Sequence, residues 1–76
     1  MAFPTDAEFT DFTTRLEAIY RDEMGRPAET THVDPLGRGR WTSDYVLHRQ
    51  HGLSHNKAWA KVDAEIRQIA GLPPNP

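Results

Sequence analysis

Residues 20–27 read Tyr-Arg-Asp-Glu-Met-Gly-Arg-Pro, in which an aromatic residue and three charged residues lead into a glycine and a proline. Gly25 is placed to end a helix in a left-handed conformation, and Pro27 follows where a helix cannot continue. Upstream, apolar residues recur at steps of three and four, as on one side of a helix. They are Phe9, Phe12, Leu16, Ile19, Tyr20 and Met24. The stretch therefore predicts the end of an amphipathic helix.

Two further signals place helix starts. Thr5-Asp6-Ala7-Glu8 has the pattern of a capping box, so the first helix is predicted to begin there. Ser54 is an N-cap candidate for a last helix, which Gly71 is placed to end. The apolar stripe of this last helix is Trp59, Val62, Ile66 and Ile69. We expect Trp59 to lie in the core, because small domains depend on such aromatic residues.

Between these helices, residues 26–40 carry Pro27, Pro35, Gly37 and Gly39, which indicates a long irregular connection. Connections of this length are uncommon unless they are functional or disordered, so this loop is the first place to look for a binding surface. A second helix is predicted from Trp41 to His51, with Gly52 ending it. The sequence therefore predicts an all-α fold, a small three-helix bundle with a long irregular loop between helices 1 and 2.

Composition sets limits on function. The chain has 76 residues, no cysteine and a net charge of −2. One small domain of this size buries only about 60% of its unfolded surface. Its basic residues are scattered among acids, which gives little support for nucleic-acid binding. No apolar run approaches the roughly 18 to 20 residues that span a bilayer, so we expect no membrane segment.

The domain boundary is expected near the carboxyl end. Residues 73–76 hold three prolines in four positions, which favours an extended linker or tail at residues 72–76 after a module that covers residues 1–71. We therefore expect a module cut from a longer protein.

Short motifs carry a resemblance to a known family. Residues 20–26 match Tyr-Arg-Asp-x-Leu-Gly-Arg, with Met24 in the leucine place. Three further elements of the pattern follow along the chain. They are Asp-Pro-x-Gly at residues 34–37, an aromatic element at Arg40-Trp41, and Gly-Leu-Ser at residues 52–54. The chain resembles a family of short helical modules of uncharacterised function in bacterial surface, secreted and tailed-phage proteins, often beside enzymes that act on glycans. The resemblance implies an accessory module in a polysaccharide context, with an extracellular or virion-associated location favoured.

The candidate ligand site surrounds the start of the second helix. Trp41 and Tyr45 lie one helical turn apart, and flat rings can stack on sugar faces. Mixed charges nearby suit a polyhydroxylated or carboxylated glycan, because arginine pairs bidentately with acids. The candidate ligand-binding residues are Trp41, Tyr45, Arg40, Arg38, Asp34 and Asp44. The competing interpretation is a core role for the rings and a solvated loop for the charges.

Other chemistry finds less support in the sequence. His48, His51 and His55 have spacings that can suit zinc, but Gly52 and Ser54 interrupt the helix between them and no cysteine joins them. We therefore expect no metal and no cofactor. Eleven acidic residues guarantee accidental carboxylate pairs, and no cleft is implied, so no catalytic residue is proposed and we expect no enzyme activity.

The leading hypothesis is a non-catalytic carbohydrate-binding accessory module of a larger bacterial or phage glycan-active protein. Its partners would be a polysaccharide or cell-surface glycan and the parent multidomain protein. The alternative is a protein-protein interaction or spacer module, which packs on a neighbouring domain or on copies of itself through apolar surface at Phe3, Phe9 or Leu72. A third and weaker hypothesis is a small nucleic-acid-binding protein, with Arg38, Arg40 and Arg49 meeting phosphates.

Overall fold

The computed structural model describes residues 4–27 and 38–74. Within these ranges the chain has four helical segments, and the second of them continues the first without a break, so that they form three helices. The four segments are α1 (Asp6–Ala18), the π-helix η1 (Ile19–Glu23), α3 (Arg38–Gln50) and α4 (His55–Ala70). No strand occurs within the described ranges. The expected all-α, three-helix fold is therefore confirmed. Residues 28–37 of the expected loop, Asp34 among them, lie outside the described part.

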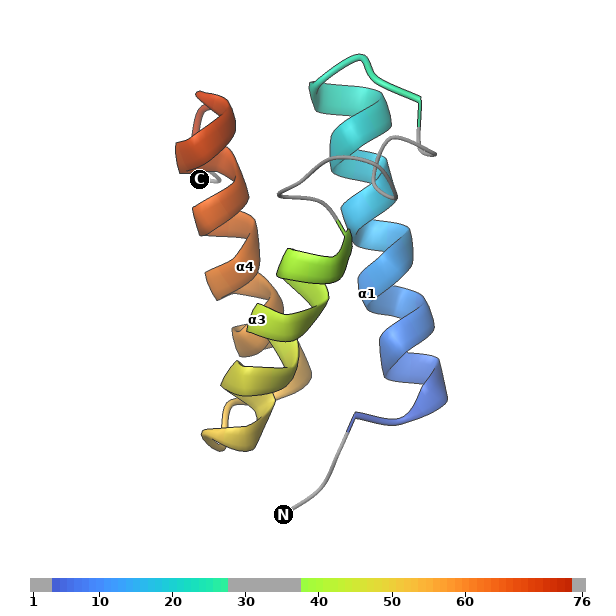
Figure 1. The fold of residues 1–76 in the computed structure, drawn as a ribbon, viewed down its shortest axis with the longest axis vertical. Helices are drawn as coiled ribbons and strands as arrows, with labels where there is room; N and C mark the ends of the chain where they lie inside the picture. Colours follow the sequence, from blue (N-terminus) through green and yellow to red (C-terminus); the bar gives the residue numbers. More distant parts are fainter. Residues whose placement is uncertain (1–3, 28–37, 75–76) are drawn as a thin grey trace.

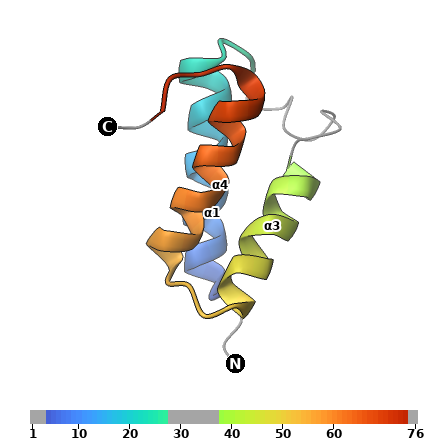
Figure 2. The same cartoon turned by 90° about the vertical axis from the view of Figure 1, so that its left-hand side faces the viewer.

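The helices run up, down and up. Following the colours in Figure 1, α1 and its extension η1 rise from blue to teal, α3 descends from green to yellow, and α4 rises again from orange to red. Figure 2 shows α4 standing in front of α1, with α3 inclined at their side. The side of α3 that faces away from α1 and α4 has no helix against it among the described segments.

The helix ends follow their local sequence signals. The Glu8 amide donates to Thr5 Oγ1 at 3.1 Å, and the Thr5 amide donates to Glu8 Oε1 at 2.9 Å, which completes the capping box. The Lys57 amide donates to Ser54 Oγ at 3.3 Å at the start of α4. Gly71 ends α4 with φ of 72°, a left-handed conformation that favours glycine. These three predicted caps are confirmed.

The end of the first helix has a feature that the sequence analysis did not predict. The chain continues beyond α1 as the π-helix η1, in which the Met24 amide donates to the Ile19 carbonyl, five residues back, at 3.1 Å. Gly25 then takes φ of 66°, as predicted for a glycine that ends a helix. Glu23, the last residue of η1, pairs with Arg67 of α4.

The second helix begins earlier than predicted. Its first residue is Arg38, not Trp41, so residues 38–40 are helical where an irregular loop was expected. Extending α3 back by one turn brings Arg40 onto the row of Asp44, and the two side chains pair at 3.1 Å. This ion pair offers one physical reason for the earlier start despite Gly39, which is unfavourable within helices.

The core lies where the three helices meet. Its buried members are Phe12, Leu16, Ile19, Tyr20, Trp41, Tyr45, Ala58, Val62 and Ile66. The stripe predicted for the first helix is confirmed, with Phe9 and Met24 packed against its buried residues. The stripe predicted for the last helix is wrong at its end, because Ile69 is 55% exposed. Trp59 packs against the core but is only partly buried.

A buried arginine connects η1 to the segment that follows α4. Arg67 of α4 donates from Nε to Asp63 Oδ1 at 2.8 Å, from Nη1 to Glu23 Oε1 at 2.6 Å, and from Nη1 to the Pro73 carbonyl at 3.2 Å. Asp63 itself is only 5% exposed, so this ion pair lies inside the bundle. The arginine holds η1 and the segment after α4 against the same helix, so the stretch at residues 20–27 serves the fold.

Candidate functional site

The two aromatic residues proposed for ligand stacking are inside the protein. Trp41 is 2% exposed and Tyr45 is 0% exposed. The Trp41 indole donates to the Tyr20 hydroxyl at 3.4 Å, and the Tyr45 ring stacks on Phe12 at a centroid distance of 4.5 Å. The expectation that one of these rings faces a ligand is wrong for this structure. A small bundle needs its largest rings to fill the space between helices.

The polar part of the predicted site does lie at the surface. Arg40 Nε donates to Asp44 Oδ2 at 3.1 Å, and the Arg40 guanidinium lies 5.9 Å from the Trp41 ring centroid. The arginine therefore stands over the buried indole while its charge is matched by the aspartate. Arg38 is the first residue of α3, and Asp34 is outside the described residues.

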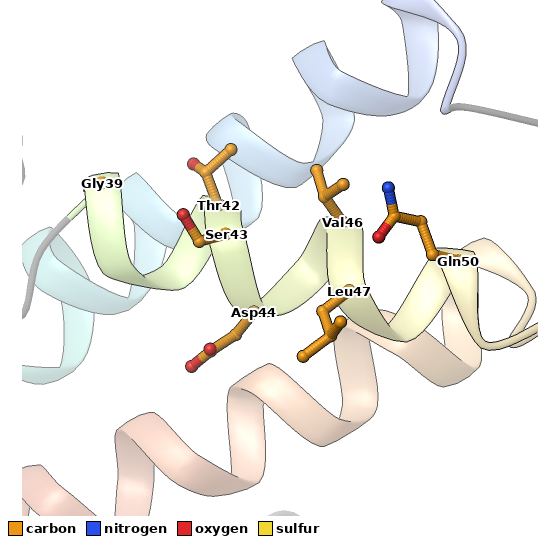
Figure 3. Close-up of a pocket in the computed structure, with 7 residues that line it drawn as sticks. All are labelled: Gly39, Thr42, Ser43, Asp44, Val46, Leu47 and Gln50. Atoms are coloured by element: carbon orange, nitrogen blue, oxygen red, sulfur yellow. The ribbon is translucent and has the colours of Figure 1, made fainter.

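The outer side of α3 forms a shallow depression of about 690 Å³. We call it the α3 surface and define it by Gly39, Thr42, Ser43, Asp44, Val46, Leu47 and Gln50, all drawn in Figure 3. In that view Thr42, Val46 and Gln50 project to one side of the helix, and Asp44 and Leu47 to the other, toward α4. Leu47 is 47% exposed. The surface thus combines an exposed aliphatic side chain with small and polar neighbours.

An acidic contact borders the α3 surface where α3 meets α4. Burial and then the hydrogen bond with Asp44 raise the pKa of the Glu65 carboxyl, while His48 and Arg40 act in the opposite direction. The nearby His48 Nε2 is buried and has no hydrogen-bond partner within the described ranges. The charged groups along this edge therefore influence the protonation of Glu65 in opposite directions.

The opposite edge of α3 carries a network that the sequence analysis missed. Tyr45 Oη lies 2.7 Å from His55 Nδ1, and His55 Nε2 lies 2.6 Å from Asp11 Oδ2. Arg49 donates to Tyr45 Oη at 3.1 Å and pairs with Glu8 at 3.0 Å. Arginine only donates and a carboxylate only accepts, so a neutral His55 with its proton on Nε2 satisfies every atom in the row.

This aspartate, histidine and tyrosine row has a structural role. The Tyr45 side chain is fully buried, and its burial raises the pKa of the phenol despite the Arg49 guanidinium. Because Asp11, Tyr45 and His55 belong to three different helices, the row joins α1, α3 and α4. No local signal could have revealed it, since Asp11 and His55 are 44 residues apart.

Within the described residues, no group of three or more histidine and acidic side chains is arranged to hold a metal ion. Likewise, none of the described helices is long and apolar enough to cross a membrane. Comparison of the chain with family models, with curated proteins and with solved structures found no match.

Proposed function

We propose that this chain is a non-catalytic protein-protein interaction module of a larger protein, and that it binds through the α3 surface. The observation that carries the proposal is the exposure of Leu47, which is 47% accessible in a shallow depression on a helix with one uncovered side. Exposed aliphatic side chains in a depression favour association because their contact removes apolar area from water.

The binding surface differs from the one first expected for this role. Phe9 and Leu72 are partly buried against the core, and Phe3 lies outside the described residues. Their apolar area is used mainly within the chain. Leu47 and Ile69 are the large hydrophobic residues with substantial exposure in the described ranges, and Leu47 alone of the two belongs to the α3 surface.

Hydroxyl-radical footprinting tests the proposal. The protein isolated undenatured from its natural source is compared with the isolated chain, and oxidation of Leu47 and Ile69 is measured by mass spectrometry. We expect protection of Leu47 in the assembled protein and similar oxidation of Ile69 in both samples. Equal oxidation of Leu47 in both samples would contradict the proposal, whereas Ile69 serves as the matched internal control.

Carbohydrate binding is the second candidate function. It is favoured by the placement of Arg40 and Asp44 on the surface beside Thr42 and Gln50, where hydroxyl, amide and charged groups surround aliphatic carbon. Such a surface offers hydrogen bonds to sugar hydroxyls without a stacked ring. It would hold an accessory module on a polysaccharide substrate.

Affinity electrophoresis separates the two candidates. The chain and its Arg40→Ala variant are run through gels that contain plant, algal or bacterial polysaccharides, with circular dichroism as the control for folding. Retardation that the substitution abolishes would support glycan binding at α3. Equal mobility in gels with and without polysaccharide would leave the interaction module as the better account.

A further inference from the structure

A projecting side chain and an open position lie at equal distances from the middle of the α3 surface. Leu47 projects from α3, whereas a Cβ atom added at Gly39 would meet nothing within 4 Å. Ser43 lies between them, four residues from each, so the projection and the open space are each about 6 Å from it along the helix. In an antiparallel pair of such helices centred on Ser43, Leu47 of each copy faces Gly39 of the other.

The charged residues at the edge of the α3 surface, Arg40 and Asp44, would also face each other in such a pair. Arg40 precedes Ser43 by three residues and Asp44 follows it by one, on the edge of α3 that faces α4. In the antiparallel pair, Arg40 of one copy is therefore only about 3 Å along the axis from Asp44 of the other. The Arg40 side chain is 52% exposed, and within the described residues its Nε donates to its own Asp44, so its Nη groups can donate to the second copy.

From this complementarity we propose that two copies of the chain pair through the α3 surface, antiparallel about a twofold axis at Ser43. The inference rests on the proposed function and names the partner as a second copy. Each Leu47 enters the space over Gly39 of the other copy, and Arg40 and Asp44 form reciprocal ion pairs at the rim. A twofold pair uses one patch twice, which is the commonest symmetry of soluble oligomers.

The pair is expected to be weak and concentration-dependent. One helix side from each copy buries less than the roughly 1,200 Å² of total area that marks the lower limit of standard interfaces. Sedimentation equilibrium of the isolated chain, up to about 1 mM, covers the range in which such a dimer forms. We expect a monomer-dimer equilibrium.

Three variants locate the interface. Leu47→Ser removes the projecting side chain, and we expect at least a tenfold weaker dimer, about 1.4 kcal/mol. Gly39→Glu places a carboxylate opposite Leu47 while adding an acid to a first helical turn that has none, so the monomer stays folded as the dimer weakens. Ile69→Ser makes the same chemical change at an exposed isoleucine outside the surface, and we expect no effect on association.

The outcomes are separable. A monomer at all concentrations overturns the pairing, and so does a dimer that Ile69→Ser weakens and Leu47→Ser does not. Circular dichroism melts of each variant confirm that the fold is kept. If the chain is monomeric while Leu47 is protected in the assembled protein, the pairing fails and the interaction module stands with another protein as its partner.

Discussion

Arg67 of α4 holds η1 and the segment after α4 together. Its guanidinium is almost buried and is shared between Asp63 beneath it and Glu23 of η1. A buried charge of this kind is stable only with its partners in place, because removing one member leaves the other desolvated. The hydrogen bond from Arg67 also lowers the pKa of the Glu23 carboxyl.

Replacing this arginine therefore carries a large penalty. Arg67→Met keeps the aliphatic length but leaves the Asp63 carboxylate, 5% exposed, without the guanidinium. We expect a loss of about 3 kcal/mol in the free energy of unfolding, measured by urea denaturation. Arg21→Met is the matched control, because Arg21 and Asp22 form an exposed pair at 3.0 Å and such pairs contribute little. Equal losses in both variants would contradict this role of Arg67.

The Tyr45 hydroxyl gives a second prediction for a single residue. Tyr45→Phe keeps the ring against Phe12 but removes the oxygen that joins Arg49 to His55. We expect a loss of about 1 to 2 kcal/mol in the free energy of unfolding, because the partly buried Nδ1 of His55 loses its donor. Urea denaturation at neutral pH measures it, and an unchanged midpoint would show that the row contributes nothing.

For the helices, the same substitution is expected to have opposite effects at two glycines. Gly39 has helical geometry and open space around it, whereas Gly71 holds φ of 72° at the end of α4. Gly39→Ala should stabilise the chain by about 0.5 kcal/mol, and Gly71→Ala should destabilise it by about 1 kcal/mol. Thermal unfolding at a low, fixed protein concentration measures both without dimer formation. Shifts in the same direction would contradict the helix-end argument.

The contact between α3 and α4 contains a carboxyl group whose ionised form is disfavoured. Burial and Asp44 raise the pKa of Glu65, so its contribution to stability is present at low pH and is lost as pH rises through the folded-state pKa. Glu65→Gln imitates the protonated form. We expect its thermal midpoint to exceed that of the wild type by a few degrees at neutral pH, and the two midpoints to converge in acid. A lower midpoint at neutral pH would reverse the assignment.

For the whole molecule, the sequence predicted what is encoded locally. The capping box at Thr5, the left-handed Gly71 and the stripe through Phe12 and Leu16 depend on residues a few positions apart, and the structure confirms them. The burial of Trp41 was not predicted, because helical periodicity groups residues on one side without saying whether that side meets the core or a ligand.

Long-range partners were also beyond the sequence. Glu23 and Arg67 are separated by 44 residues, so their pairing follows only once η1 and α4 are packed together. The outer side of α3 became a candidate site for the same reason, since only the packed bundle shows that Leu47 is left outside. The resemblance to short helical modules remains a prediction, as does the glycan context that it implies.

The ion pairs together predict how the chain responds to acid. Among the described residues, four carboxyl groups have a pKa below the ordinary value: Glu8 through the Thr5 amide and Arg49, Asp11 mainly through His55, Asp22 through Arg21, and Glu23 through Arg67. A lowered pKa means that the group stabilises the fold above its unfolded-state pKa, and that this contribution is lost as pH falls through the folded-state pKa.

We therefore expect the free energy of unfolding, measured by urea denaturation, to fall steadily from the ordinary carboxyl range down to about pH 3. Glu65 opposes this trend, because its raised pKa favours the fold on protonation, but in the described part of the chain it is one group against four. Glu23→Gln should lower stability at neutral pH and flatten the acid decline, since one of the four groups no longer titrates. If the free energy of unfolding of this variant fell as steeply with pH as that of the wild type, protonation of Glu23 in its pair with Arg67 would not contribute to the acid decline.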